Sequence, residues 1–267
     1  MKRENPGQPF TFRKSLGQHF LTDPNIIHKI IDACQLESND SVLEIGPGDG
    51  ALTRHISPRV NGVYAVDADR RLCEKLSKEF FTTNVKIIHA NILKFDLSSL
   101  PSPIKVIGNL PYNISSPIIE RIMIHREKIH SVFFTVQWEF GKRLVAKPNT
   151  KDYSSLSCFV QNYADVKILF QIKKSSFYPS PKVTSCFLRW AFKTHPLSKG
   201  IDEEVLFHVI RLCFQQRRKT IANALSRMIP KDELQSILHS LKIDSRLRAE
   251  NLSINDYIRL TKALDTH

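Results

Sequence analysis

Four consecutive residues near the middle of the chain have groups suited to holding a planar amine. They are Asn109, Leu110, Pro111 and Tyr112, and they follow an apolar run over 104–108 that is typical of a buried strand. Ligands of open α/β sheets bind at the carboxyl ends of such strands. There, an amide oxygen and a backbone carbonyl can accept the two protons of an amine while an aromatic ring stacks on the base. The segment therefore predicts a pocket for the exocyclic amine of a nucleobase.

A glycine-rich turn and an acidic residue predict where a cofactor binds. Three glycines follow an expected strand over 41–45, and they are Gly46, Gly48 and Gly50. Their GxGxG spacing differs from GxGxxG, which favours an uncharged or zwitterionic nucleoside over a phosphate. Asp67 ends the next strand, about twenty residues later, where it can accept both ribose hydroxyls of an adenosine. We expect Asp69 to be the N-cap of the following helix instead.

Together these sites describe a methyltransferase that uses S-adenosylmethionine. NAD is the competing cofactor, but the 109–112 segment has no role in hydride transfer. The N6 lone pair of adenine is delocalised into its ring, so the amine is a poor nucleophile. The Asn109 side-chain oxygen and the Leu110 carbonyl can hold both protons and direct the lone pair toward a sulfonium methyl. Pro111 fixes the direction of the carbonyl, and Tyr112 stacks on the base.

A second aromatic segment and the charge of the chain point to RNA. Phe177 begins a proline-rigid loop over 177–183, where its ring could sandwich a flipped base against Tyr112. The chain has 39 Lys and Arg against 26 Asp and Glu, a net charge of +13, which favours a polyanionic partner. The basic clusters are Arg13 with Lys14, Arg70 with Arg71, Lys173 with Lys174, and Arg217, Arg218 and Lys219. We expect the last cluster to lie on a helix that also carries Arg211.

The fold class follows from the order of the expected elements. Strands and helices alternate as far as about residue 146, which predicts a Rossmann-like, doubly wound parallel sheet. Residues 157–190 have strand-rich patterning without a helix, which predicts a closing antiparallel hairpin, and the pattern is helical from about 202. We therefore expect a methyltransferase domain over 1–195 and a small all-α domain over 196–267.

Composition also bears on the compartment and on partners. The five cysteines are odd in number and form no CxxC pair, which argues against a disulfide framework or a zinc site. No apolar run reaches the length of a membrane span, and the N-terminal residues lack the apolar core of a secretory signal. We expect a cytoplasmic protein without a metal or a membrane partner. No long heptad pattern is present, so a monomer is expected.

The motifs resemble those of the rRNA adenine N6-methyltransferases, and among these the branch that dimethylates small-subunit rRNA. The segments that carry the resemblance are SLGQHFL (15–21), EIGPG (44–48), NLPYNIS (109–115) and FYPSPKV (177–183). The segments RRKTIANAL (217–225) and RAENLS (248–253) resemble the small-subunit branch in particular. The resemblance covers the chain from about Phe12 to Leu264.

The resemblance implies dimethylation of N6 on two adjacent adenosines in the 3′-terminal hairpin loop of small-subunit rRNA. It also implies that the substrate is the assembling 30S subunit rather than free RNA. The positions that match the cofactor contacts of the family are His19, Leu21, Gly46, Asp67, Asn91 and Asn109. His19 stands where an Asn is usual, and Asn91 where an Asp is usual. From these two departures we expect weaker cofactor affinity, but not lost activity.

Two other functions remain open. An Erm-type methylase of large-subunit rRNA shares the fold, the cofactor and the chemistry, and the 217–225 segment argues against it. A non-catalytic factor that binds and checks the immature small subunit is the second alternative. An intact 109–112 segment argues against a loss of catalysis, although one protein can have both roles.

Overall fold

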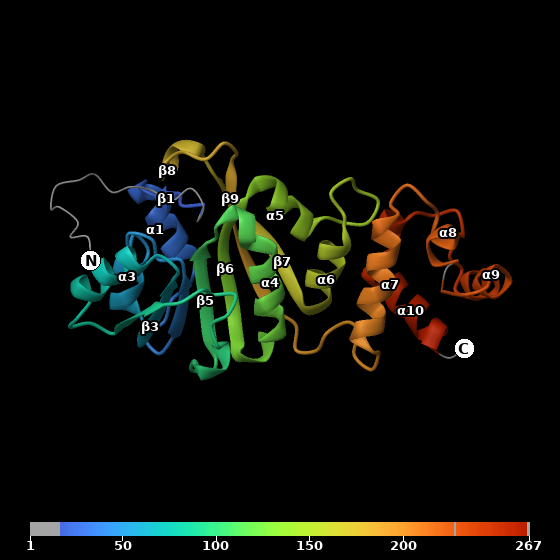
Figure 1. Cartoon of the computed structure of the whole chain (residues 1–267), viewed down its shortest axis with the longest axis horizontal. Coiled ribbons are helices and arrows are strands. Elements are labelled where there is room, and N and C mark those ends of the chain that lie inside the picture. Colours follow the sequence, from blue (N-terminus) through green and yellow to red (C-terminus); the bar gives the residue numbers. More distant parts are fainter. Residues whose placement is uncertain (1–16, 227, 266–267) are drawn as a thin grey trace.

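The computed structural model describes residues 17–226 and 228–265, which form a central sheet with helices on both faces and a group of helices beyond one end (Figure 1). The strands of this sheet, in spatial order, are β4 (Val85–His89), β3 (Gly62–Asp67), β2 (Ser41–Ile45), β5 (Ile104–Asn109), β6 (Ile129–Gln137), β9 (Ser185–Phe192) and β7 (Ala164–Ile172). The strands β4 to β6 are parallel, and β9 is antiparallel to both β6 and β7. The predicted Rossmann-like α/β fold is confirmed.

Helices alternate with strands in the first part of the chain, and among the described residues only helices follow β9. In chain order the helices are α1 (Pro24–Ala33), α2 (Thr53–Ile56), α3 (Arg70–Glu79), α4 (Ser115–Ile124), α5 (Trp138–Val145), α6 (Ser155–Tyr163), α7 (Glu203–Gln215), α8 (Ile221–Leu225), α9 (Lys231–Ser240) and α10 (Ile254–Asp265). Short 3-10 helices cover Ser57–Arg59, Leu97–Ser99, Tyr112–Ile114, Arg126–Lys128, Lys174–Ser176 and Ala249–Asn251. No helix in the described part of the chain is long and apolar enough to span a membrane.

Two hydrophobic clusters cover the two faces of the sheet. Successive residues of a strand point to opposite faces, so Val42 and Ile107 belong to one cluster, whereas Leu43 and Val106 belong to the other. The first cluster includes buried side chains of α1 and α2, and the second includes those of α4. Burial on both faces explains why these strands are continuous apolar runs in the sequence.

The prediction of strand structure from residue 157 onward is wrong at its start. Residues 157–163 belong to α6 and are not part of a strand, although the antiparallel pairing of β7 with β9 that follows is as expected. Ser154 and Ser157 form a reciprocal capping box, in which each side chain accepts a hydrogen bond from the backbone N–H of the other. Because this cap begins a helix, the β-branched and aromatic residues that follow it pack as a helical face.

The helices beyond the sheet continue the second hydrophobic cluster. Tyr153, just before α6, contacts the ring of Phe214 on α7, and Phe214 contacts Tyr257 on α10, with ring centroids 6.0 and 6.1 Å apart. Tyr153 and Tyr257 are fully buried. Aromatic packing of this kind fixes the C-terminal helices against the sheet-bearing part of the chain.

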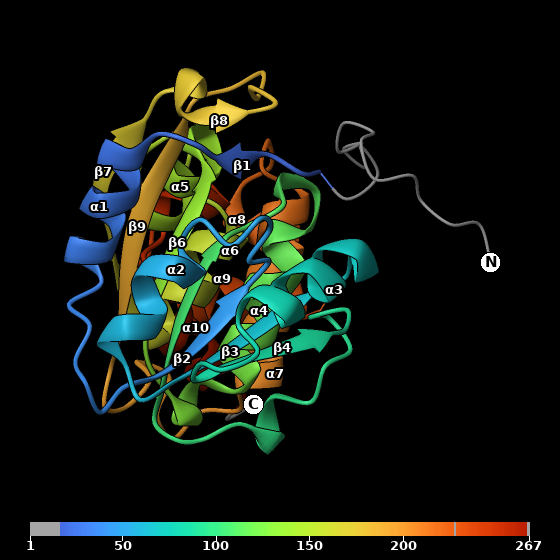
Figure 2. The ribbon, with the colours of Figure 1, turned by 90° about the vertical axis from the view of Figure 1, so that its left-hand side faces the viewer.

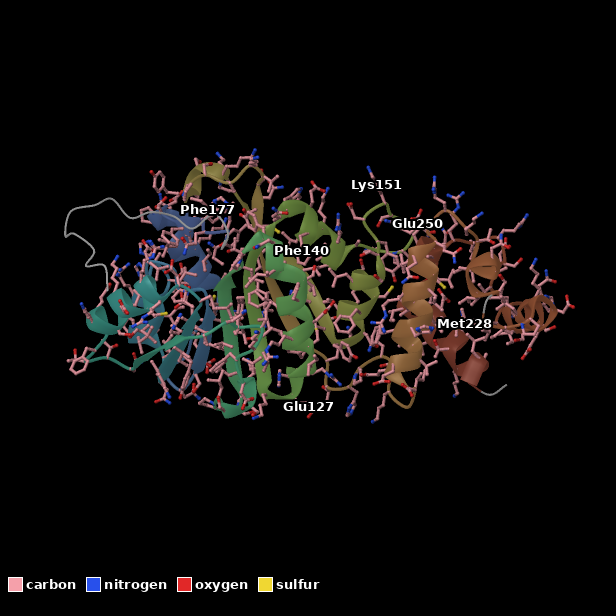
Figure 3. The ribbon with its side chains drawn as sticks, viewed as in Figure 1. Glu127, Phe140, Lys151, Phe177, Met228 and Glu250 are labelled. Atoms are coloured by element: carbon pink, nitrogen blue, oxygen red, sulfur yellow. The ribbon has the colours of Figure 1, made fainter. Side chains whose placement is uncertain are left out.

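A short loop between α5 and α6 is also tied to the C-terminal helices. The Arg217 guanidinium donates to the carbonyls of Lys151 (3.1 Å) and Tyr153 (3.2 Å) and to the Glu250 carboxylate (2.5 Å). The backbone N–H of Asn149 donates to the Glu250 carbonyl at 2.8 Å. Figure 3 labels Lys151 and Glu250 on the two sides of this junction.

A two-stranded sheet lies outside the main one. Its strands are β1 (Phe20–Leu21) and β8 (Phe177–Tyr178), which pair antiparallel with Phe20 opposite Tyr178 and Leu21 opposite Phe177. Figure 2 shows the two strands side by side. This pairing brings residues 20–21 of the first motif and residues 177–178 of the fourth together, although they lie far apart in the sequence.

Candidate active site

The candidate active site is a cavity at the carboxyl ends of β2 and β5, where the strand order reverses. Its volume is about 240 Å³. Ligands of doubly wound sheets bind at this switch point. The cavity is lined by His19, Gly46, Asp67, Asn91, Asn109 and Tyr112 among other residues. Five segments that the sequence singled out separately therefore meet around one space.

The orientation of the Asn109 amide is set by one hydrogen bond. Its Nδ2 donates to the backbone carbonyl of His19 at 2.7 Å. Because a carbonyl only accepts, the atom that faces it must be the NH₂ group, and Oδ1 is left as an acceptor. The neighbouring Leu110 is held from β6, since its N–H donates to the Thr135 carbonyl at 3.0 Å. The two acceptors predicted from the sequence are the Asn109 Oδ1 and the Leu110 carbonyl. Both residues are thus held by a hydrogen bond, one to His19 and the other to Thr135.

The Tyr112 ring is held by contacts with two other segments. Its hydroxyl forms a 2.6 Å hydrogen bond with the hydroxyl of Ser185 at the start of β9. The imidazole of His19 stacks on the ring, with centroids 5.6 Å apart and an interplanar angle of 26°. Burial raises the pKa of Tyr112 above its usual value, so the hydroxyl stays protonated near neutral pH.

The Asp67 carboxylate lies between the glycine turn and the next helix. It accepts hydrogen bonds from the backbone N–H of Gly48 (3.3 Å) and of Asp69 (2.8 Å). Burial raises the pKa of Asp67, and the backbone N–H groups partly oppose that rise. A desolvated carboxylate of this kind gains from further donors such as hydroxyl groups. Asp69 is the N-cap of α3, as predicted, and its hydrogen bonds with Arg71 lower its pKa to about 2.

Asn91 reaches the cavity from the loop after β4. Its Oδ1 accepts a hydrogen bond from the backbone N–H of Leu93 at 2.9 Å, which closes an Asx turn. Part of the acceptor capacity of the Asn91 amide is therefore used by a hydrogen bond within its own loop. The other polar atom of the side chain, Nδ2, only donates.

Comparisons with known proteins agree with this geometry. The family model described as ribosomal RNA adenine dimethylase matches residues 9–266. The chain belongs to the ribosomal RNA adenine dimethylase family. Its relatives in Geobacillus thermodenitrificans and Bacillus mycoides are named ribosomal RNA small subunit methyltransferase A. The first is 38% identical over 96% of this chain and 92% of the relative, and the second is 37% identical over 97% and 93%.

Solved structures show the same fold. A dimethyladenosine transferase from Plasmodium falciparum is 26% identical, with a TM-score of 0.82 over 93% of this chain and 98% of that one. The 23S rRNA methyltransferase ErmE is 24% identical, with a TM-score of 0.72 over 92% and 99%. The likeness to ErmE shows the fold alone. Both likenesses extend over more than nine tenths of this chain.

Two of the residues predicted for the site lie outside the lining of the cavity. Leu21 is 5% exposed and Phe177 is 3% exposed, and both pack in the hydrophobic cluster under α1. Figure 3 labels Phe177 within the ribbon, close to β1 and β9. Tyr178, the next residue, is 63% exposed. A base-stacking role for Phe177 stays a prediction, and in this conformation little of its ring is accessible.

The sequence left several lining residues unassigned. Gln18, within the first family motif, lines the cavity, and its Nε2 donates to the Asp69 carboxylate at 3.0 Å. Ile92 and Ile118 supply apolar walls. Adjacency to Asn91 could have indicated Ile92, but no spacing rule identifies Ile118, because it reaches the cavity from the middle of α4.

Three arginines of the predicted basic clusters pair with acidic side chains of the protein. Arg70 pairs with Glu74 and Arg71 with Asp69, each at 2.8 Å. Residues 217–219 lie in the turn after α7, so their placement on a helix was wrong. Arg217 pairs with Glu250 and holds the loop between α5 and α6, as described above. Arg13 and Lys14 lie outside the described residues, as do Ser15 and Leu16 of the first motif. Within the described residues, no group of side chains could hold a metal ion.

Glu44, in β2 two residues before Gly46, is a buried acid that we expect to titrate near neutral pH. It is 1% exposed, and its carboxylate accepts a 2.7 Å hydrogen bond from the Thr53 hydroxyl. Burial raises the pKa of Glu44 to about 7. Since this folded pKa is above the unfolded one, the protonated form favours folding at low pH, and that contribution is lost as pH rises through 7.

This raised pKa predicts that Glu44→Gln changes the pH dependence of stability. Relative to the variant, the free energy of unfolding of the wild type should fall by about 2 kcal/mol between about pH 5.5 and about pH 8. Urea unfolding at both pH values measures it, with Glu120→Gln on the exposed side of α4 as the control. Parallel curves for wild type and Glu44→Gln would show that Glu44 does not titrate in this range.

Proposed function

We propose that this protein transfers methyl groups from S-adenosylmethionine to N6 of two adjacent adenosines in the 3′-terminal hairpin loop of small-subunit rRNA, within the assembling subunit. The Asn109 amide carries the proposal, because its fixed orientation leaves Oδ1 as an acceptor beside the Tyr112 ring. The family and the names of the relatives support the rRNA substrate. The 217–225 segment and the names of the relatives favour the small-subunit branch over an Erm-type enzyme.

The cavity fits a nucleoside cofactor. Gly46 has a φ of +68°, and the nearest atom to a Cβ built on it is the Asn109 carbonyl oxygen at 4.0 Å, so a side chain there would enter open space. Asp67 would accept ribose hydroxyls, while Asn91 and Ile92 would flank the adenine; that all three line the cavity supports this arrangement. When bound, S-adenosylmethionine supplies an electrophilic methyl group on a sulfonium.

The residues of the chain position the amine for transfer. Asn109 Oδ1 and the Leu110 carbonyl accept the two N6 protons, which draws the lone pair out of conjugation with the ring. Tyr112 offers its face to the base, and Pro111 sets the direction of the preceding carbonyl. This is catalysis by positioning and electrostatics, without a covalent intermediate on the protein.

We assign methyl transfer to residues 1–195 and recognition of the rRNA and the small subunit to residues 196–267. The last strand, β9, ends at Phe192, and the next long element is α7 from Glu203, which supports this division. The hydrophobic cluster shared by both parts, together with the hydrogen bonds that Arg217 makes to Lys151, Tyr153 and Glu250, favours rigid coupling between them.

Asn91→Asp is expected to tighten cofactor binding. An aspartate can hold the Leu93 N–H as Asn91 does and still offer a second, charged oxygen to the adenine amine. The dissociation constant for S-adenosylhomocysteine should fall roughly tenfold by calorimetry, the scale of one charge-assisted hydrogen bond. Asn25→Asp, on the exposed first turn of α1, is the matched control. Equal affinities for wild type and Asn91→Asp would remove Asn91 from the adenine subsite.

Mapping the modified nucleotides tests the proposed substrate. The enzyme and the cofactor are incubated with immature small subunits and, separately, with large-subunit rRNA, and dimethyladenosine is located by primer extension. We expect stops at two adjacent adenosines of the small-subunit hairpin only. Stops in the large-subunit rRNA instead would assign the protein to the Erm-type activity.

A further inference from the structure

His19 joins three parts of the candidate site. Its backbone carbonyl accepts the hydrogen bond that orients Asn109, at 2.7 Å. Its ring nitrogen Nδ1 lies 2.7 Å from the carbonyl of Pro179, a residue 160 positions away in the sequence. Its ring stacks on Tyr112. One side chain thus contacts both the loop after β8 and the residue expected to stack on the base.

The contact with Pro179 settles which tautomer His19 has. Because a carbonyl only accepts, Nδ1 must carry the proton. An asparagine, the usual residue here, has its Nδ2 the same number of bonds from the backbone, so it could donate the same hydrogen bond. The aromatic face is what the histidine adds. In this chain that face lies on Tyr112, with an interplanar angle of 26°.

Ser185 holds the same ring from another direction. It is fully buried, and its hydroxyl forms the 2.6 Å hydrogen bond with the Tyr112 hydroxyl. Pro179 directly follows β8 and Ser185 begins β9, so the two residues lie at the two ends of the segment 179–185. This segment is therefore fixed to the 109–112 turn at two points, through His19 and directly by Ser185.

We propose that His19 and Ser185 are positioning residues that hold Tyr112 in the orientation needed for methyl transfer. The inference rests on the proposed function and extends it to residues that need not touch the cofactor. It also changes what the histidine is expected to do. From the sequence, we expected His19 to alter cofactor affinity. From its contacts with Pro179 and Tyr112, we expect it to alter the rate of methyl transfer instead.

A double-mutant cycle tests the Ser185 contact. Tyr112→Phe and Ser185→Ala remove the two ends of one hydrogen bond, and the first keeps the stacking ring. Each should lower kcat about tenfold, because small displacements of a positioned group are costly, with the dissociation constant for S-adenosylhomocysteine unchanged within about twofold. The double variant should be no slower than either single one, since both remove the same interaction. Ser99→Ala, which removes an exposed hydrogen bond to the Asp96 carbonyl away from the cavity, is the matched control with unchanged kcat.

Two substitutions separate the contacts of His19. His19→Asn keeps a donor for the Pro179 carbonyl and loses the ring, whereas His19→Phe keeps a ring and loses the donor. His19→Ala loses both, and it should lower kcat about tenfold with cofactor affinity unchanged within about twofold. The Asn and Phe variants should each recover part of this loss. A merely structural role would lower thermal stability without this ordered recovery in kcat.

The outcomes distinguish this inference from the proposed function. An active wild type whose His19→Ala and Ser185→Ala variants keep full kcat would overturn the inference alone. So would additive losses in the Tyr112 and Ser185 cycle, or a loss in His19→Ala that lies wholly in cofactor affinity. A wild type that transfers no methyl group to small-subunit rRNA would overturn the proposed function and this inference with it.

Discussion

Asn109→Ala is expected to lower kcat for methyl transfer by about two to three orders of magnitude, the scale of losing one preorganised hydrogen-bonding group at a reacting centre. The substitution removes the Oδ1 acceptor, which the hydrogen bond from Nδ2 to the His19 carbonyl keeps available for the base. Without it, only the Leu110 carbonyl remains to hold the amine, and the lone pair returns to conjugation with the ring. Single-turnover transfer from labelled cofactor measures the effect.

Asn109→Asp refines this prediction. It keeps an acceptor for the amine but places a second oxygen against the His19 carbonyl, where the Asn109 Nδ2 now donates. We expect its kcat to lie between the wild type and Asn109→Ala. Asn25→Ala, on the exposed first turn of α1, is the control for mutation of an asparagine. If Asn109→Ala retained wild-type kcat, the amide could not be the group that orients the amine.

The second large effect is expected on cofactor affinity in Asp67→Ala. The Asp67 carboxylate is partly desolvated, so hydroxyl donors from a ribose should bind it strongly. Losing two charged hydrogen bonds should raise the dissociation constant for S-adenosylhomocysteine at least about 100-fold, which is roughly 3 kcal/mol. Removal of the carboxylate also frees the Gly48 N–H, which would loosen the glycine turn. Titration calorimetry measures the change directly.

Asp96→Ala is the matched control for Asp67→Ala. Asp96 also accepts a backbone N–H, that of Ser98, but it caps a short exposed helix and does not line the cavity. Its substitution should leave cofactor affinity unchanged. Asp67→Asn should lie between the two, since an amide oxygen still accepts one hydroxyl. An affinity within about threefold of wild type in Asp67→Ala would place the ribose elsewhere.

The sequence was sufficient for features that depend on local pattern. Asp23 followed by Pro24 is a typical start of a helix, and in α1 Asp23 accepts hydrogen bonds from the N–H groups of Asn25 and Ile26. The apolar runs marked β2 and β5 because strands buried on both faces have no polar alternation. The rule on strand ends then indicated the turn at Asn109, at the end of β5, and the acid at Asp67, at the end of β3.

Features that depend on contacts between distant segments could not be read in this way. The start of α6 was missed because its cap is a pair of serines and lacks the usual acidic partner. Arg217 was interpreted as part of an RNA-binding surface because its partner Glu250 lies 33 residues away. The pairing of His19 with Pro179 joins the two ends of the sheet-bearing part of the chain, and no spacing within either motif indicates it.

The most direct test of the proposed function is nucleoside analysis after transfer. The purified protein is incubated with immature small subunits and labelled S-adenosylmethionine, and the rRNA is digested to nucleosides and separated. We predict that the label appears in N6,N6-dimethyladenosine and is lost with Asn109→Ala, while the variant still binds the subunit. Label in another nucleoside, or no transfer by the wild type, would contradict the assignment of Asn109, Leu110, Pro111 and Tyr112 to the methylation of adenine N6.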